Sequence, residues 1–307
     1  MSKFDKIEEL QRIIKEDSAN LDARRQLAVL LMDCGFNEES LGHLLHLSKA
    51  FSYDEGIFYN LGIVYEKMKN FPKAKEAYLK ALELEPEYQD AIYNLGLVYT
   101  ELREYDFAIE CFNNILENDP EDSNSYFNLG LVYFKKNNLI LAIENFQKTI
   151  DINDEDLYAH FYIGNILKEF GDLEAAKEKF EKVIELSPNY SWAYFNLAAI
   201  YNEENQAQMA IENLQKTIEM NPYDIEAYKL LIRLLLKEQD YAGAVETVEI
   251  ALSECEETGD IDYLAALTYE SAGDIENAII YFEKAIKNYQ TLSLSVQKVK
   301  SELNKLK

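Results

Sequence analysis

Apolar residues recur three and four positions apart along the whole chain, and no stretch alternates apolar with polar residues as a strand would. The segments FYNLGIVYEKM and KAKEAYLKALEL, residues 58–68 and 73–84, are two such helices, with a turn near residues 69–71. Pro86 ends the second helix, because proline lacks an amide donor and restricts the residue before it. The pattern predicts an all-α protein made of helix pairs.

Glycine, proline and alanine recur along the chain with a common period of 34 residues. The glycines are Gly62, Gly96, Gly130 and Gly164, the prolines are Pro86, Pro120, Pro188 and Pro222, and the alanines are Ala74, Ala108, Ala142, Ala176, Ala210, Ala244 and Ala278. At this period, residues 21–292 divide into eight repeats, which begin at Leu21, Glu55, Gln89, Ser123, Leu157, Ser191, Ile225 and Gly259. A fixed period of this length predicts a solenoid of stacked helix pairs. We expect a capping helix in residues 1–20, the eight repeats in residues 21–292, and a second capping helix in residues 293–307.

The recurring residues have a packing role. A small residue at the eighth position of a repeat is expected to let the two helices of a pair approach closely, while large aromatic residues fill the space beside them. Gly35, Gly171 and Gly273 share one phase at the inner turn, where a left-handed backbone suits glycine. Ile232 replaces the small residue in the seventh repeat and is expected to widen or tilt that helix pair.

The second repeat resembles the tetratricopeptide repeat family, whose signature is matched by Phe58, Leu61, Gly62, Tyr65, Ala74, Tyr78, Ala81 and Pro86. The resemblance extends over about nine-tenths of the chain. It implies a right-handed superhelical solenoid of antiparallel helix pairs, whose first helices line a concave face. It also implies a scaffold for protein–protein interaction.

Positions on the first helices that the core does not need are therefore the candidate peptide-binding groove. They are Tyr59, Asn60, Ile63, Tyr93, Asn94, Leu97, Phe127, Asn128, Leu131, Phe134, Phe161, Asn165, Trp192, Phe195 and Asn196. The sixth position of a repeat is often asparagine, whose amide offers a donor and an acceptor to a peptide bond. The ninth position is apolar at Ile63, Leu97 and Leu131, and an exposed apolar row implies a partner that covers it.

Both features also have structural interpretations. The asparagines can bond a neighbouring helix instead of a ligand. The apolar row can be buried by tighter curvature or by a second copy of the chain, so self-association stays open.

Charge narrows the choice of partner. The chain has 56 acidic and 30 basic residues and a formal net charge of −26, which repels nucleic acid and anionic membranes and attracts basic partners. No stretch is apolar enough for a signal peptide or a membrane span. Cys34, Cys111 and Cys255 are widely spaced, which favours reduced thiols and a cytoplasmic location.

Residues suited to catalysis are scarce. His43 and His46 lie three residues apart but lack a nearby third ligand, so no metal is expected, and no phosphate-binding glycine loop indicates a cofactor. His160 takes a position that holds core residues in other repeats. We therefore expect no enzyme. The leading hypothesis is a scaffold that binds an extended or helical peptide segment of a partner; the alternative is a regulatory receptor for a short signalling peptide that acts through a separate output protein.

Overall fold

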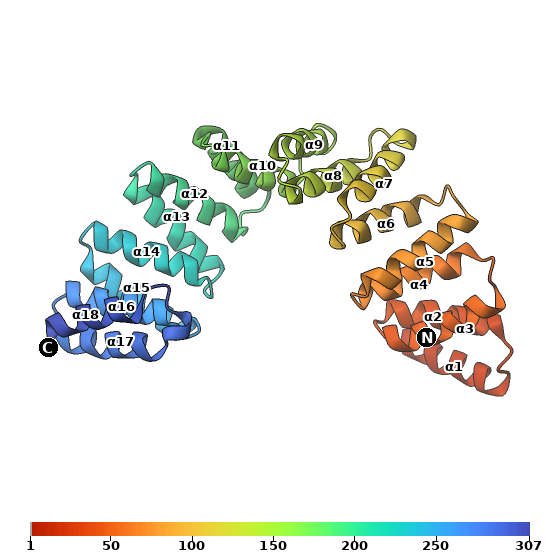
Figure 1. The fold of residues 1–307 in the computed structure, drawn as a ribbon, viewed down its shortest axis with the longest axis horizontal. Helices are drawn as coiled ribbons and strands as arrows, with labels where there is room; N and C mark the ends of the chain where they lie inside the picture. The colour runs from red at the N-terminus through yellow and green to blue at the C-terminus, as the bar shows by residue number, and fades with distance from the viewer. Residues whose placement is uncertain (1) are drawn as a thin grey trace. The chain divides into compact units, whose positions relative to one another are not determined.

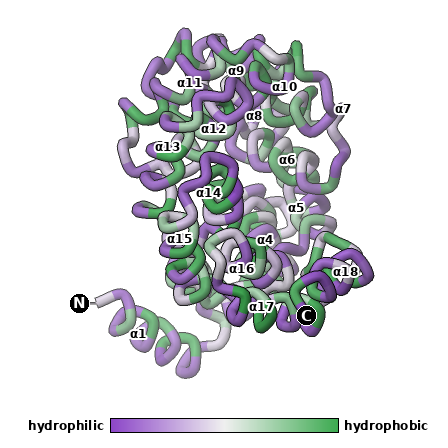
Figure 2. The backbone as a smooth tube through the Cα atoms, turned by 90° about the vertical axis from the view of Figure 1, so that its left-hand side faces the viewer, coloured by the Kyte–Doolittle hydropathy of each residue, from purple (hydrophilic) through white to green (hydrophobic). Residues whose placement is uncertain are grey.

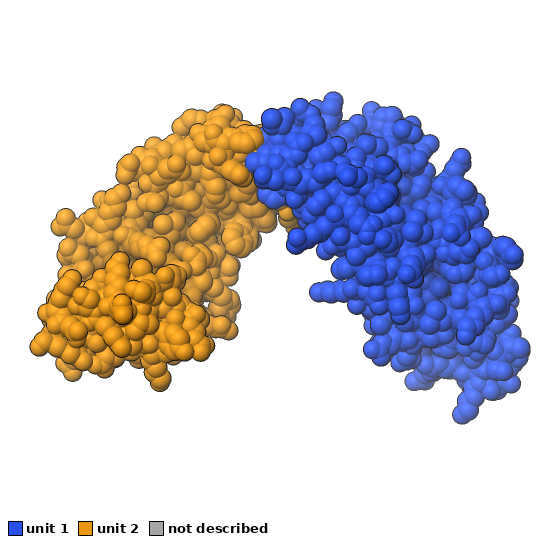
Figure 3. Space-filling view, in the orientation of Figure 1, with its two compact units in different colours: residues 1–154 blue, residues 155–307 orange. Residues whose placement is uncertain are grey.

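The computed structural model describes residues 2–307, and these residues form α-helices and one short 3₁₀ helix with no strand (Figure 1). This confirms the predicted all-α fold. The chain divides into two compact units, Met1–Asp154 and Glu155–Lys307 (Figure 3). Along the helices, hydrophobic and hydrophilic stretches alternate (Figure 2), as expected when one side of each helix packs against its neighbours.

The first compact unit contains one helix followed by four helix pairs. Its helices are α1 (Lys3–Glu16), α2 (Leu21–Asp33), α3 (Asn37–Ala50), α4 (Glu55–Lys67), α5 (Phe71–Leu84), α6 (Gln89–Glu101), α7 (Tyr105–Asn118), α8 (Ser123–Lys135) and α9 (Leu139–Ile152). Residues 1–20, in which a capping helix is expected, contain α1, and residue 1 lies outside the described residues. Ile7 and Leu10 of α1 pack against Leu27 and Leu31 of α2 in one buried cluster.

The second compact unit contains four further pairs and a closing helix. Its helices are α10 (Leu157–Glu169), α11 (Leu173–Leu186), α12 (Ser191–Glu203), α13 (Ala207–Met220), α14 (Ile225–Lys237), α15 (Tyr241–Glu254), α16 (Gly259–Ser271), α17 (Ile275–Lys287), the 3₁₀ helix Tyr289–Thr291 and α18 (Val296–Leu306). Even-numbered labels from α2 to α16 therefore mark the first helices of the repeats, and odd-numbered labels from α3 to α17 mark the second helices.

The turn inside each pair adopts a left-handed backbone. Gly35, Gly171 and Gly273 have φ angles of 81° to 82°, which confirms the role predicted for them. The other repeats place a non-glycine residue at the same phase and force it into the same region, with φ between 56° and 62°. These residues are Lys69, Arg103, Asn137, Asn205 and Gln239. The turn geometry is therefore common to all eight repeats, whatever residue occupies it.

Glycine at the eighth position allows a close approach between paired helices. A Cβ atom added to Gly62 would lie 2.3 Å from the ring of Tyr78, and one added to Gly130 would lie 2.6 Å from the ring of Phe146. In the seventh repeat, the larger Ile232 takes the place of the glycine, and Val248 takes the place of the aromatic ring that Tyr78 and Phe146 provide. Ile232 and Val248 are both fully buried in one cluster. The smaller Val248 thus provides room for Ile232.

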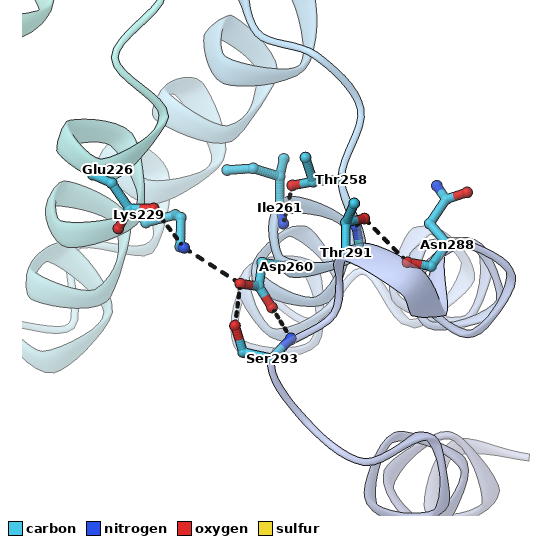
Figure 4. Close-up of polar contacts among 9 residues, drawn as sticks. Glu226, Lys229, Thr258, Asp260, Ile261, Asn288, Thr291 and Ser293 are labelled. Atoms are coloured by element: carbon cyan, nitrogen blue, oxygen red, sulfur yellow. Dashed lines mark hydrogen bonds and ion pairs between the residues drawn. The ribbon is translucent and has the colours of Figure 1, made fainter. Parts of the chain in front are cut away.

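The C-terminal helix is held by buried contacts and by a polar anchor. Val299 and Leu303 of α18 are buried with Phe282 of α17. Ahead of α18, Asp260 at the start of α16 accepts hydrogen bonds from the backbone N–H of Ser293 at 2.7 Å and from its hydroxyl at 2.6 Å (Figure 4). The segment that leads into α18 is therefore fixed to the first turn of α16.

Candidate binding site

Side chains of α10, of α12 and of the loop before α12 surround a hollow of about 410 Å³ in the second compact unit. We call this the tryptophan hollow. It is lined by Phe161, Asn165, Tyr190, Trp192, Phe195 and Asn196. The structure thus brings together every candidate groove residue that lies in this unit, and it adds Tyr190, which sequence reasoning missed.

Aromatic rings form most of the wall of the tryptophan hollow. Trp192 is 53% exposed, and its ring lies 6.2 Å from that of Phe195 at an interplanar angle of 78°. The rings of Phe161 and Tyr190 are 5.3 Å apart at 76°. Both pairs have the edge-to-face geometry that aromatic rings prefer. The wall is therefore held by contacts between the rings themselves, while about half of Trp192 remains exposed to solvent.

Tyr190 occupies the position immediately before a first helix, where most repeats have a capping residue. Asp54, Asp122, Asp156 and Asp224 hold the equivalent position, and each accepts a hydrogen bond from a backbone N–H in the first turn. Tyr190 makes no such bond. Burial raises its pKa, and the nearby Tyr158 and Tyr162 add to the effect, so the hydroxyl stays neutral. In this repeat, packing against the hollow has replaced helix capping.

The two asparagine side chains of the tryptophan hollow differ in their hydrogen bonding. Asn196 is buried, donates to the backbone oxygen of Trp192 at 2.8 Å, and accepts a hydrogen bond from the amino group of Lys168. Burial lowers the pKa of Lys168, and the carboxylate of Glu203 acts in the opposite direction. Asn165 is half-buried, and its side chain makes no hydrogen bond to any residue that the structure describes. Asn165 is therefore the amide with donors and an acceptor left for a ligand.

In the first compact unit, Asn94 and Asn128 each bond a tyrosine of the preceding repeat. The side-chain N–H of Asn94 donates to the hydroxyl of Tyr59 at 3.3 Å. Asn128 donates to the hydroxyl of Tyr93 at 2.8 Å and to the backbone oxygen of Asn124 at 2.9 Å. One N–H of each amide therefore bonds the preceding first helix, and the second N–H of Asn128 bonds its own helix. What Asn128 still offers a ligand is its carbonyl oxygen.

The apolar row is less open than the sequence suggested. Ile63, Leu97 and Leu131 are all half-buried. Ile63 and Leu97 pack against the buried cluster that contains Tyr78 and Phe112, which explains why these side chains do not project freely into solvent.

Aromatic candidates in the same unit also contact the core. The ring of Tyr59 lies 4.8 Å from that of Tyr88, which precedes α6 as Tyr190 precedes α12. Tyr93 lies 5.8 Å from Phe112, and Phe127 lies 5.5 Å from Phe146. The half-buried Phe134 and Asn60 complete the candidate positions in this unit. In this unit the fifth-position rings therefore pack against buried rings of the second helices, in addition to lying on the candidate groove.

The histidines have structural surroundings. His160 is buried, as predicted. Burial and the nearby Arg24 lower the pKa of His43, whose Nδ1 lies 3.2 Å from Arg24 Nη1. Between residues 2 and 307, no group of three or more His, Cys, Asp or Glu side chains is placed to hold a metal ion. No helix in that same range is both long and apolar enough to cross a membrane.

Comparison with known families identifies the repeat. Tetratricopeptide repeat models match residues 57–88 and 263–291, and the model of the ETO1 C-terminal domain matches residues 88–264, more than half of the chain. A search of curated proteins found no match.

Solved structures with similar folds include three bacterial proteins. MamA from Desulfovibrio magneticus RS-1 is 26% identical with a TM-score of 0.53, covering 56% of this chain and 97% of that chain. PilF from Pseudomonas aeruginosa is 21% identical with a TM-score of 0.57, covering 71% and 98% respectively. A tetratricopeptide repeat protein from Parabacteroides merdae is 20% identical with a TM-score of 0.54, covering 93% and 98%. The similarity to the last two concerns the fold alone.

Proposed function

The chain belongs to the tetratricopeptide repeat family, and from that premise we propose that it is a scaffold that binds a peptide segment of a partner protein in the tryptophan hollow. Family membership supports a role in protein interaction in general. The proposal adds the place of contact and the chemistry of the bound segment.

The observation that carries the proposal is that Tyr190, at a position where most repeats have a helix cap, lines a hollow beside the exposed Trp192. A capping side chain before a helix typically contributes about 1 kcal/mol, and Tyr190 forgoes that hydrogen bond. In return, its ring forms part of the wall beside the exposed Trp192. A residue that favours a surface hollow over local helix stability is expected where the hollow has a function.

The lining indicates what the hollow accepts. Four aromatic rings form an uncharged wall suited to a bulky apolar side chain, since aromatic residues commonly anchor protein interfaces. Asn165 lies in the same wall with a free amide, which fits one peptide group of an extended segment. The bound segment is therefore expected to place an aromatic or large aliphatic residue next to exposed backbone.

The net charge of −26 indicates the character of the flanking residues. A protein so acidic attracts basic segments at long range, and salt weakens this attraction. The association rate with a segment that carries lysine or arginine beside its apolar anchor should fall as salt rises, while the dissociation rate changes less.

The proposal can be tested with Tyr190→Asp, which restores the capping residue found in other repeats and removes one of the four rings of the aromatic wall. We would select peptides from a random phage-displayed library on the full chain and measure their affinity for the wild type and variants. Tyr190→Asp and Trp192→Ala should each weaken binding by about tenfold or more, as loss of a hot-spot residue does. Thermal unfolding should show Tyr190→Asp to be folded.

Tyr88→Asp is the matched control, because Tyr88 also lacks a capping bond but lies before α6 in the other compact unit. It should leave the affinity of the selected peptides unchanged. If the peptides bind Tyr190→Asp and Trp192→Ala as tightly as the wild type, the tryptophan hollow is not the binding site.

A further inference from the structure

A second groove, of about 600 Å³, lies between the second helices α13 and α15, with the first helix α14 at its floor. We call it the second-helix groove. The floor is formed by the buried residues Tyr228, Leu231 and Leu235, and the walls include Ile211 and Ile218 of α13 and Gly243, Thr247 and Ile250 of α15. None of these residues belongs to the tryptophan hollow, so this groove is a separate surface of the same compact unit.

The seventh repeat departs from the others at this groove. At the twenty-sixth position, where five repeats have lysine, it has Ile250, which is 42% exposed. The lysines are Lys80, Lys148, Lys182, Lys216 and Lys284. Gly243 also lines the groove, and a Cβ atom added there would lie 2.5 Å from a carboxylate oxygen of Asp240, which caps α15. An exposed isoleucine in place of a solvated lysine marks a surface suited to contact with another apolar group.

The rim of the second-helix groove carries negative charge alone. Asp240, Glu219 and Glu246 line it, and no lysine or arginine does. None of these three carboxylates takes part in an ion pair with the residues that the structure describes. A partner that brings positive charge to the rim would therefore meet carboxylates that no lysine or arginine already neutralises.

The groove has the length of a short helix. Its α13 wall runs from Gln208 to Glu219, a distance of about 16 Å at 1.5 Å per residue, or about three helical turns. An amphipathic helix with apolar residues at i, i+3, i+4 and i+7 presents one apolar stripe over that length. We infer that the second-helix groove binds a basic amphipathic helix, whose apolar stripe contacts Ile211 and Ile250 and whose lysines or arginines face Asp240, Glu219 and Glu246.

A synthetic peptide of about 14 residues, with leucine at i, i+3, i+4 and i+7 and lysine elsewhere, is a suitable probe of this surface. Its fluorescein-labelled form would be titrated with the full-length protein and followed by anisotropy. Ile250→Lys should weaken binding by about tenfold or more, because it removes an apolar anchor and adds a positive charge that repels the lysines of the peptide. Amide exchange of the wild type with bound peptide should slow in α13 and α15.

Ile280→Lys is the matched control for the added charge, since Ile280 lies on α17 outside the groove and is 44% exposed. It should leave the affinity within about twofold of the wild type, as expected for a distant surface charge. Tyr190→Asp should also leave it unchanged, which separates this groove from the tryptophan hollow. Glu219→Gln combined with Glu246→Gln should weaken binding and reduce its dependence on salt, and this variant tests the rim without touching the apolar floor.

Several results would overturn the inference. One is the absence of binding to the wild type. Another is an equal loss of affinity in Ile250→Lys and Ile280→Lys, which would mean that overall charge alone attracts the peptide. Equal binding of a peptide with glutamate in place of lysine would exclude the role given to the rim. Dimerisation of the wild type that Ile250→Lys abolishes, measured by sedimentation velocity, would assign the groove to a second copy of the chain.

Discussion

Asn128 donates a 2.8 Å hydrogen bond to the hydroxyl of Tyr93, 35 residues earlier, and so joins one first helix to the preceding one. Asn94 makes the same contact with Tyr59 at 3.3 Å. Phe161 has no hydroxyl to offer the next repeat, and there Asn196 bonds Trp192 and Lys168 instead. The partners of Asn94, Asn128 and Asn196 thus depend on whether the fifth position of the preceding repeat carries a hydroxyl.

Tyr93→Phe removes this contact while it keeps the ring. It should lower the free energy of unfolding by about 0.5 to 1.5 kcal/mol, because one N–H of the half-buried Asn128 loses its acceptor. Urea denaturation measures the change, and a double-mutant cycle with Asn128→Ala isolates the pair. Tyr133→Phe serves as a control, since the Tyr133 hydroxyl makes no hydrogen bond with described residues. Equal effects of the two tyrosine changes would show that the bond contributes nothing measurable.

Gly130→Ala should destabilise the fourth repeat, because the new Cβ would lie 2.6 Å from the ring of Phe146. The expected cost is about 1 to 3 kcal/mol, as for other overpacked cores. Adding Phe146→Leu should recover part of it, since the chain already places Ala198 and Leu214 at these two positions of the sixth repeat. Denaturation of the two single variants and the double variant measures the coupling. If their effects simply add, the two sites do not compete for space.

The same substitution should have opposite effects at two glycines. Gly171→Ala forces alanine to a φ of 81° and should cost about 1 kcal/mol. Gly42→Ala lies within α3, where nothing beyond the adjacent residues and the backbone of that helix lies within 4 Å of the added Cβ, and it should stabilise the protein by about 0.5 to 1 kcal/mol. Thermal and urea denaturation measure both changes, and effects of the same sign would contradict the turn geometry described above.

Ser293→Ala should loosen the C-terminal helix, because it removes the hydroxyl that donates to Asp260. Amide exchange in α18 should become faster by roughly the equivalent of 0.5 to 1.5 kcal/mol of local stability. Ser301→Ala, on the exposed side of α18, is the control. The prediction fails if both variants exchange at the wild-type rate.

The same anchor should weaken in acid. Burial raises the pKa of Asp260, but the hydrogen bonds from Ser293 and Lys229 lower it, and the net result is a pKa below the usual value for aspartate. A carboxyl with a depressed pKa stabilises the folded state above the ordinary aspartate value of about 3.9, and this stability is lost as the pH falls through the lower folded pKa. Exchange in α18, compared between the wild type and Asp260→Asn, should converge across that range of pH.

Much of the fold could be predicted because each repeat places the same residue types at the same packing positions. The turns show the limit of that reasoning. Gly35, Gly171 and Gly273 indicated a left-handed residue, but Lys69 and Arg103 adopt the same backbone without any sequence signal, since their side chains impose no such preference. The surrounding helix pair determines their conformation.

The candidate site was only partly predictable. Phase alone pointed to Trp192, Phe195 and Phe161, because the first helix determines which way they face. Tyr190 was missed since it precedes the helix, although a tyrosine among capping aspartates was a usable signal. Bonding to a neighbouring helix was one of the two interpretations of the asparagines, but the partner of Asn128 could not be inferred, because it depends on where a hydroxyl of another repeat lies.

The contact of Gly62 with Tyr78 lies wholly within one repeat. Duplication or deletion of a complete 34-residue cassette would therefore carry both partners together and leave the interior of every other cassette intact. A crossover within a cassette would instead combine a glycine with a small partner, or an isoleucine with an aromatic ring, and leave a void or a clash. Lengthening of such a protein during evolution should accordingly proceed in whole repeats, with a tyrosine–asparagine pair to be matched at those junctions that have one.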